Sequence, residues 1–333
     1  MNAAILREWY PMSFAQKLIR WQRGSGRHNL PWQGTRDPYR IWLSEIMLQQ
    51  TQVAAVIPYY ERFLGRYPSV AALAAASEDD VLRLWSGLGY YARGRNLHKA
   101  AQLIRERGFP TTAEKIAELP GVGRSTAAAI AVFAFGERAA ILDGNAKRVL
   151  ARRFGTEENL WGLAERLLPE TDVEAYTQAL MDLGATLCTR APQCGNCPVK
   201  PDCVARKAGR IAELPAPKPK RPLPLKCVTW FVYRADRAVL LERRPAPGIW
   251  GGLWCFPERA RMRAGRGAAL APIEHGFTHF RLRIRPVLHE TTRRKGGVWL
   301  DMDEAIAAAI PTPVKKLLQD LKRTATARAG KAR

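Results

Sequence analysis

The 333-residue sequence is poor in acidic residues. It has 30 Asp and Glu against 53 Lys and Arg, which gives a formal net charge of +23. This shortage of negative charge disfavours cationic partners and predicts an anionic one, with nucleic acid ahead of an anionic membrane surface. Charge alone leaves a ribosome-associated or generally basic protein open.

Long apolar runs and export signals are also missing. The segment from Met1 to Trp21 is interrupted by charged residues and proline, which is not the pattern of a signal peptide. The longest run of small apolar residues, Thr126 to Phe135, is too short to span a bilayer. We therefore expect no membrane association.

Cysteine is scarce, but four of the six cysteines lie close together. Cys188, Cys194, Cys197 and Cys203 are separated by five, two and five residues. In a chain without an export signal this disfavours a disulfide framework and predicts an all-thiolate site, either an iron–sulfur cluster or zinc. The five histidines form no metal-ligand pattern.

The first two thirds of the chain lack the alternating pattern of β-strands. From residue 14 to about 204, apolar residues recur at three- and four-residue intervals, with short Gly/Pro breaks. This predicts an all-α domain over residues 1–212. Residues 213–226 interleave proline with lysine and arginine, which is typical of a stiff linker.

Beyond the linker the pattern changes to mixed α and β. Three runs favour strands: residues 227–233, 238–241 and 281–285. Two short segments favour helices, residues 302–310 and 314–321. We predict an α+β domain over residues 227–322 and a basic, disordered tail over residues 323–333. The chain as a whole is multidomain.

One candidate for acid–base chemistry is Glu45. On a helix, Ile41, Glu45 and Leu48 share one apolar stripe. Burial there would raise the pKa of the carboxyl and make it a general acid near neutral pH. The alternative is a glutamate at the edge of the stripe that reaches solvent.

A Gly/Pro hairpin, expected within residues 113–136, is the second candidate feature. Pro120, Gly121 and Gly123 interrupt the helical pattern, and the amides at the start of the following helix suit a phosphate. Asp143 follows about twenty residues later. An ordinary helix–helix turn and a helix N-cap at Asp143 are the alternatives.

These residues carry a resemblance. Leu119-Pro-Gly-Val-Gly123 followed by Asp143 resembles the helix-hairpin-helix signature of DNA base-excision glycosylases. Residues 44–53, Ser-Glu-Ile-Met-Leu-Gln-Gln-Thr-Gln-Val, are similar to the catalytic-helix motif of the adenine DNA glycosylase (MutY) family. The match runs from about residue 30 to 203 and, more weakly, from about 229 to 318.

The resemblance implies roles for the candidate residues. Glu45 would protonate adenine, and an ionised Asp143 would stabilise the cationic sugar or form a covalent adduct with it. Ser125 stands where endonuclease III-like enzymes carry a nucleophilic lysine, which implies a monofunctional glycosylase. Gly121, Gly123 and Ser125 would lie against DNA.

Further DNA contacts are implied outside the hairpin. Residues 87–99 pair aromatic side chains with a basic run, and Tyr90 would be the wedge beside the lesion base. On the sequence alone, a tyrosine pair packed between helices is an alternative. Gln49 would help to fill the gap left by the flipped adenine.

The family also implies a [4Fe-4S] cluster in the loop of residues 188–203. The first interval between cysteines is one residue shorter here than in the family, so zinc or a labile cluster stays open. Residues 243–257 resemble a Nudix-like module, but residues 258–272 are Arg/Ala/Gly-rich where true Nudix hydrolases have an acidic helix. Phe277, Thr278 and His279 resemble the family's Phe-Ser-His loop, which contacts the oxidised guanine, with threonine in place of serine.

We therefore predict a monofunctional DNA repair glycosylase that removes adenine paired with 8-oxoguanine or guanine and leaves an abasic site. Its partner would be double-stranded DNA, and we expect a monomer in a bacterial cytoplasm, associated with the nucleoid. One alternative is an endonuclease III-like bifunctional glycosylase and lyase. The other is a non-catalytic, structure-specific DNA-binding protein, which would need neither Glu45 nor Asp143.

Overall fold

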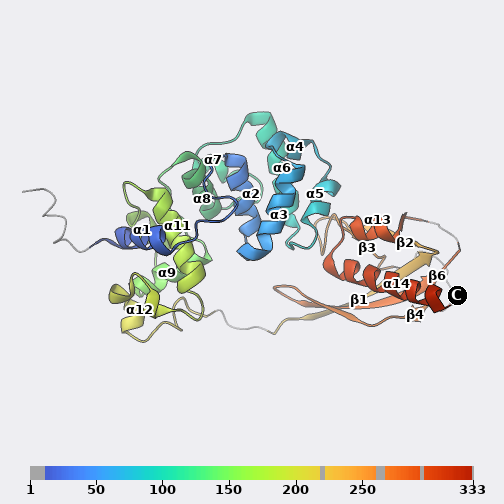
Figure 1. Ribbon diagram of the computed structural model, residues 1–333. Coiled ribbons are helices and arrows are strands. Elements are labelled where there is room, and N and C mark those ends of the chain that lie inside the picture. The colour runs from blue at the N-terminus through green and yellow to red at the C-terminus, as the bar shows by residue number, and fades with distance from the viewer. Residues whose placement is uncertain (1–11, 218–221, 260–266, 293–295, 332–333) are drawn as a thin grey trace, which may run out of the picture. The chain divides into compact units, whose positions relative to one another are not determined.

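The computed structural model describes residues 12–217, 222–259, 267–292 and 296–331 (Figure 1). Three sequence-based expectations lie partly outside these stretches. They concern the N-terminal segment compared with export signals, the middle of the proline-rich linker, and the Arg/Ala/Gly-rich segment that stands in place of an acidic helix. Within the described stretches, no helix is both long and apolar enough to cross a membrane.

The chain divides into two compact units, and each unit consists of two separate stretches of the sequence. The first unit holds Met1–Ala74 and Lys99–Pro219, and the second holds Ala75–His98 and Lys220–Arg333. A segment from the helical region therefore belongs to the same unit as the C-terminal domain. The division cuts across the boundary expected from composition, which lies at the linker.

Helices build the first unit, and residues 12–217 contain no strand. Its helices are α1 (Phe14–Ser25), α2 (Pro38–Leu48), α3 (Val53–Arg66), α4 (Val70–Ala75), α6 (Ala92–Arg107), α7 (Ala113–Ile116), α8 (Arg124–Phe135), α9 (Gly144–Phe154), α10 (Leu160–Arg166), α11 (Val173–Asp182) and α12 (Val204–Lys207), with α4 and α6 each reaching into the second unit. A π-helical turn, η2 (Leu183–Leu187), and two 3-10 turns, η3 (Cys194–Asn196) and η4 (Lys200–Asp202), lie between α11 and α12. The prediction of an all-α region is confirmed.

Local sequence explains where the helices near the hairpin and the candidate carboxylates begin and end. Asp37 caps α2, because its side chain accepts a hydrogen bond from the Tyr39 amide at 2.9 Å, and Pro38 occupies the first helical position. Helix α8 ends at Gly136, whose φ of 69° is left-handed and therefore suits glycine. These signals explain where α2, which carries Glu45, begins and where α8, which carries Ser125, ends.

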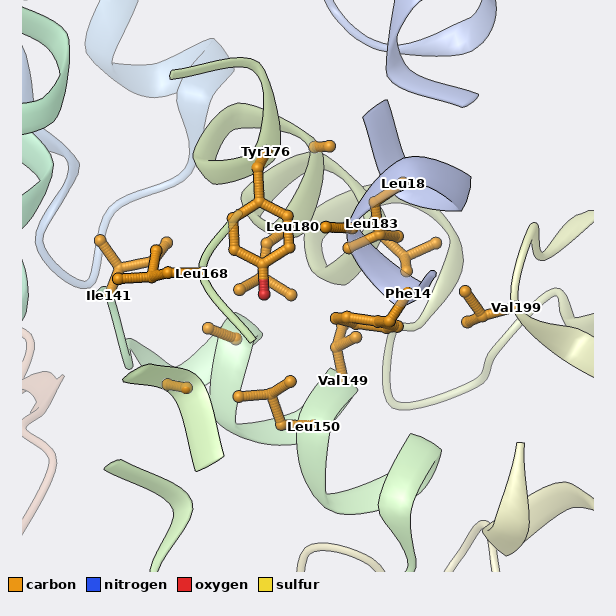
Figure 2. Close-up of a cluster of buried hydrophobic side chains, with 14 of the residues drawn as sticks. Phe14, Leu18, Ile141, Val149, Leu150, Leu168, Tyr176, Leu180, Leu183 and Val199 are labelled. Atoms are coloured by element: carbon orange, nitrogen blue, oxygen red, sulfur yellow. The ribbon is translucent and has the colours of Figure 1, made fainter. Parts of the chain in front are cut away.

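The core of the first unit lies among α1, α9 and α11 (Figure 2). Phe14 and Leu18 of α1 are buried with Val149 of α9 and with Tyr176 of α11. The ring of Phe14 meets the ring of Tyr176 edge to face, with centroids 6.3 Å apart. Burial of each such side chain stabilises the fold by about 1.5–3 kcal/mol. This core anchors α9, the helix that begins directly after Asp143.

The second unit combines helix α5 (Glu78–Trp85) with a seven-stranded mixed sheet. The strands are β1 (Leu225–Ala235), β2 (Ala238–Arg243), β3 (Trp254–Cys255), β4 (Ala268–Ala269), β5 (Ile273–Gly276), β6 (Arg281–Glu290) and β7 (Val298–Asp301). Their order is β3-β2-β1-β6-β4, with β5 also paired to β6 and β7 to β2. Strands β1 and β6 are parallel, and the other neighbours are antiparallel. The α+β prediction for the C-terminal domain is confirmed.

Two helices follow the sheet, α13 (Met302–Ala307) and α14 (Thr312–Lys331). The expectation of a disordered tail after residue 322 is wrong, because α14 continues through Lys331. Residues 323–329 are alanine, threonine and arginine, and alanine and arginine are strong helix formers with no proline to stop them. Basic composition alone therefore did not decide the conformation of this segment.

Candidate active site

Glu45 lines a pocket of about 750 Å³ in the first unit. It keeps some exposed surface because it faces this pocket, while Ile41, Ser44 and Ile46 around it on α2 are buried. Burial of the carboxyl, with a further contribution from the charge of Asp143, raises its pKa to about 8. At neutral pH most Glu45 side chains are therefore protonated, as a general acid requires.

Asp143 is the N-cap of α9, and its Oδ1 accepts a hydrogen bond from the Ala146 amide at 2.7 Å. Burial raises its pKa, while the amides of Ala146 and Asn145 and the charge of Arg148 oppose that rise. The negative charge of Asp143 in turn adds to the rise of the Glu45 pKa. The cap hydrogen bond and Arg148 thus favour an ionised Asp143 beside a protonated Glu45.

Ser125 holds the backbone immediately before Asp143. Its Oγ accepts a hydrogen bond from the Leu142 amide at 3.0 Å. The hairpin in front of it has an exposed Gly121 with φ of 80° and an exposed Gly123 that is the N-cap of α8. The sequence marks Ser125 as a predicted DNA contact and as a position without the lysine of endonuclease III-like enzymes, but it does not indicate this hydrogen bond to the segment that carries Asp143.

Gln49 joins the end of α2 to the hairpin. Its Nε2 donates to the carbonyl oxygen of Gly121 at 3.2 Å and to Thr126 Oγ1 at 3.4 Å. The next residue, Gln50, has φ of 57°, a left-handed conformation that is unusual for glutamine. The segment similar to the family's catalytic-helix motif thus contains a sharp turn between α2 and α3. A role for Gln49 beside a flipped base stays a prediction.

Sequence reasoning missed the other wall of the pocket. Arg27, Leu30 and Trp32 line it from the loop between α1 and α2. Arg27 donates from Nε to the fully buried carboxylate of Asp182 at 2.7 Å, and its backbone amide donates to the same carboxylate at 2.9 Å. The one available signal was Asp182, an acidic residue on the apolar side of α11 that needs a cationic partner.

The four predicted cysteine ligands line one small cavity in the first unit. The π turn η2 leads into Cys188, whose amide donates to the carbonyl of Leu183 at 2.7 Å. Arg152 lies beside it, with Nη1 3.6 Å from Cys188 Sγ and 2.6 Å from the carbonyl oxygen of Thr189. In the described part of the chain, no group of three or more His, Cys, Asp or Glu is arranged to hold a single metal ion.

The second unit carries the remaining predicted contact residues. Tyr90 is exposed and has a left-handed φ of 46°, whereas Tyr91 is buried and its hydroxyl accepts from the Gly87 amide at 3.2 Å. Of the tyrosine pair, the ring of Tyr91 is packed and that of Tyr90 is exposed, and the role of Tyr90 as a wedge stays a prediction. The guanidinium of Arg93 lies 5.3 Å from the centre of the Tyr90 ring.

Phe277, Thr278 and His279 form the tip of the β5–β6 hairpin. The amide of Phe277 donates to the carbonyl of Phe280 at 2.9 Å, and the two rings stack with centroids 4.4 Å apart. Thr278 and His279 occupy the exposed turn, with Oγ1 of the threonine 3.4 Å from Nδ1 of the histidine. The hairpin therefore presents two polar side chains on a rigid aromatic base.

Two family models match the chain. The model of the HhH-GPD superfamily base excision DNA repair protein matches residues 43–170, and the model of the NUDIX domain matches residues 228–320. The first includes Glu45, the hairpin and Asp143, and the second includes nearly the whole sheet, α13 and the first part of α14.

Curated relatives match almost the whole chain. An adenine DNA glycosylase of Buchnera aphidicola subsp. Baizongia pistaciae is 34% identical, over 93% of this chain and 97% of the relative. An adenine DNA glycosylase of Homo sapiens is 33% identical, over 92% of this chain and 73% of the relative.

Solved structures match the helical part. A thermostable thymine-DNA glycosylase superposes with a TM-score of 0.55 and 30% identity, over 59% of this chain and 95% of that one. Endonuclease III in a non-covalent DNA complex has the same fold, with a TM-score of 0.52 and 19% identity over 63% of this chain and 98% of that one. With its helical domain, its Nudix domain and near full-length relatives, the chain belongs to the adenine DNA glycosylase family of the HhH-GPD superfamily.

Proposed function

We propose that this chain hydrolyses the N-glycosidic bond of adenine in double-stranded DNA when the adenine is paired with 8-oxoguanine or guanine. The observation that carries the proposal is the pair of carboxyl groups: Glu45 lines a pocket and has a pKa raised to about 8, and Asp143 is capped by the Ala146 amide and lies near the charge of Arg148. Family membership supplies adenine as the base. A DNA-binding protein without catalysis would need neither carboxylate.

The two carboxyl groups suit the two halves of the reaction. Adenine leaves only after a ring nitrogen is protonated, so Glu45 gives its proton to the base as the carbon–nitrogen bond breaks. The electron pair of that bond stays with adenine, and the sugar becomes an oxocarbenium-like cation, as in O-glycoside hydrolysis. The carboxylate of Asp143 stabilises this cation or bonds to it, and water then supplies the hydroxyl of the abasic site.

We further propose that the enzyme is monofunctional. Strand scission by a glycosylase needs an amine that attacks the sugar, and Ser125 offers a hydroxyl that accepts a hydrogen bond from the Leu142 amide instead. The alternative, an endonuclease III-like lyase, would require another lysine to reach the sugar.

The cofactor we propose is a [4Fe-4S] cluster bound by Cys188, Cys194, Cys197 and Cys203. The residues fit it, because all four line one cavity and Arg152 beside Cys188 balances thiolate charge. The alternative occupant of the same four thiolates is a single zinc ion, which would need four sulfurs about 2.3 Å from one point. The cluster would hold the loop in shape, and a bacterial cytoplasm would keep the thiolates reduced.

For recognition of the opposite base, we propose the hairpin tip. Thr278 and His279 are exposed donors and acceptors of the kind that read base edges. Tyr90 would insert as the wedge, and Gln49 would lie near the space that the flipped adenine leaves.

The deciding experiment incubates the purified full chain with duplexes that hold one 8-oxoguanine:adenine, guanine:adenine or thymine:adenine pair. We expect free adenine from the first two, faster from the first, with the abasic strand intact until it is heated with base. Strand scission without heating would favour the endonuclease III-like alternative. Tight mispair binding without release of adenine would favour the non-catalytic one.

A further inference from the structure

Helix α5, which precedes the Tyr90 loop, is held by the C-terminal domain. Trp254 of β3 donates from Nε1 to Asp79 Oδ1 at 2.9 Å, and Arg243 of β2 donates from Nη2 to Glu78 Oε1 at 3.3 Å. Arg243 and Trp254 are themselves paired across the two strands. The first turn of α5 therefore meets one built surface of the sheet.

The chain on the other side of α5 is held as well. The hydroxyl of Ser86 donates to the carbonyl oxygen of Ile310 at 2.6 Å, and Nη1 of Arg95 donates to the carbonyl oxygen of Gly251. At the adjoining Gly252, whose φ is 82°, a side-chain carbon would lie 3.3 Å from Leu82 of α5. The C-terminal domain thus contacts the segment before and after residues 87–91.

The loop between these contacts is strained and connected to them. Tyr90 has a left-handed φ of 46°, which a non-glycine residue keeps only when its surroundings enforce it. Inside the segment, Trp85 Nε1 donates to the carbonyl oxygen of Gly89 at 3.1 Å. Movement of α5 would therefore reach the Tyr90 loop through Trp85.

We propose that Glu78, Asp79, Ser86 and Arg95 are positioning residues through which the C-terminal domain holds Tyr90 in place. Building on the proposed function, we infer that the domain which reads the opposite base also sets the wedge that enters the stack. Base recognition and base flipping are then coupled through one compact unit. If the linker were the only connection of the C-terminal domain to the helices, base recognition and base flipping would be independent.

Charge exchange across the Glu78–Arg243 pair gives the sharpest test. In the full chain we compare Glu78→Arg, Arg243→Glu and the double variant, together with the milder Trp254→Phe, which removes the indole N–H and part of the ring but introduces no charge. Asp80→Asn is the matched control, because Asp80 lies in the same helical turn and, among the residues that the structure describes, its side chain bonds within the segment, to Arg83 and Ser77. Far-ultraviolet circular dichroism verifies that each variant is folded.

Two readouts apply. Hydrogen exchange of the amides of residues 87–91 is measured without DNA, and fluorescence of a 2-aminopurine beside the mispair reports insertion of Tyr90. We expect exchange to rise by about tenfold or more in Glu78→Arg and Trp254→Phe, with insertion weakened, and both to recover in the charge-exchanged double variant. Asp80→Asn should match the wild type.

The outcomes separate this proposal from the proposed function. Unchanged exchange and fluorescence in every variant of a chain that still releases adenine would overturn the coupling alone. Failure of the double variant to recover, with Asp80→Asn equally affected, would also overturn it, because α5 would then be generally fragile. If the wild type released no adenine, the proposed function would fail, and the exchange data would still decide how the loop is held.

Discussion

Glu45 and Asp143 both carry a carboxyl group, but the protein places the two groups in different environments. Burial raises the pKa of Asp143, but its hydrogen bond from the Ala146 amide and the charge of Arg148 favour the ionised form. The pKa of Glu45 is raised by burial and by the negative charge of Asp143. Such a difference in environment is a recurrent way to obtain an acid and an anion from two carboxyl groups at one pH.

Glu45→Gln should lower the rate of adenine release by at least about 100-fold, since a general acid contributes roughly 10²–10⁴ to a rate. Binding of the mispair should stay within about threefold of wild type, because the amide keeps the shape of the side chain. Single-turnover release of adenine and a binding titration measure the two effects. Equal losses of binding and release would make Glu45 a structural residue.

The same pKa predicts the pH dependence of the wild type. Glu45 must be protonated, so the rate should fall as pH rises through about 8. Asp143 must be ionised, so the rate should also fall on the acid side, at a pH above that of an ordinary aspartate because burial raises its pKa. A rate that is flat between pH 7 and 9.5 would argue against Glu45 as the acid.

Ser125→Lys should add strand-nicking activity, because an amine would then lie next to Asp143 where the sugar opens. The change also removes the acceptor for the Leu142 amide, so we expect adenine release to slow by about tenfold. Borohydride trapping of the protein on DNA measures the new activity, and Ser125→Ala is the control for the lost hydrogen bond. Trapping of the wild type would contradict its assignment as monofunctional.

At the scale of elements, the sequence predicted those with strong patterns. Helices around Glu45 and the hairpin follow from apolar periodicity, caps and Gly/Pro breaks, and β1, β2 and β6 from runs of β-formers. Strands β3 and β4 have two residues each, too few to show alternation. The pocket wall from Arg27 to Trp32 is loop, and its place is set by long-range contacts, the bond of Arg27 to Asp182 and the edge-to-face packing of Trp32 on Tyr60.

The loop of residues 188–203 should make the purified protein brown, with about four iron and four sulfide per chain. The four cysteines line one cavity, and the π-helical turn η2 ends directly before Cys188, the first of them. Metal analysis and the visible absorption spectrum measure this. A colourless protein with one zinc per chain would contradict this prediction. Cys194→Ser should reduce the iron content without affecting the folding of the C-terminal domain.

The β5–β6 hairpin should determine which mispair is preferred. In the double variant Thr278→Val with His279→Ala, we expect the preference for 8-oxoguanine:adenine over guanine:adenine to fall about 5- to 150-fold, which corresponds to 1–3 kcal/mol. The turn should keep its shape because Phe277 and Phe280 still stack. Glu274→Gln on the neighbouring strand is the control, and an unchanged ratio of the two excision rates would exclude the hairpin as the reader.

At the scale of the whole molecule, the two compact units differ from what composition suggests. Proline and lysine mark a linker before β1, and this pattern predicts that the helical region folds as one domain. The structure instead groups residues 75–98 with the C-terminal domain. No local pattern could show this, because the contacts come from single residues such as Asp79 and Trp254 that are 175 positions apart.

This grouping changes what truncation near Pro215 should do. From the sequence alone, the remaining helical region should keep part of its guanine:adenine excision and lose only its preference for 8-oxoguanine. The structure indicates a larger loss, because truncation removes Trp254, Arg243 and the carbonyl of Gly251 from α5 and its neighbours. Helix α5 has only eight residues, and isolated helices shorter than about 12–15 residues are marginal in water.

We therefore expect the truncated chain to excise adenine from both mispairs at least about tenfold more slowly than the full chain and to be cut by protease within residues 86–91. Single-turnover rates on the two duplexes and mapping of the proteolytic fragments measure these effects. The hairpin variant is the control, since it alters base preference while every contact of α5 stays intact. A truncated chain that resists protease there and retains the full guanine:adenine rate would mean that residues 75–98 keep their conformation without the C-terminal domain.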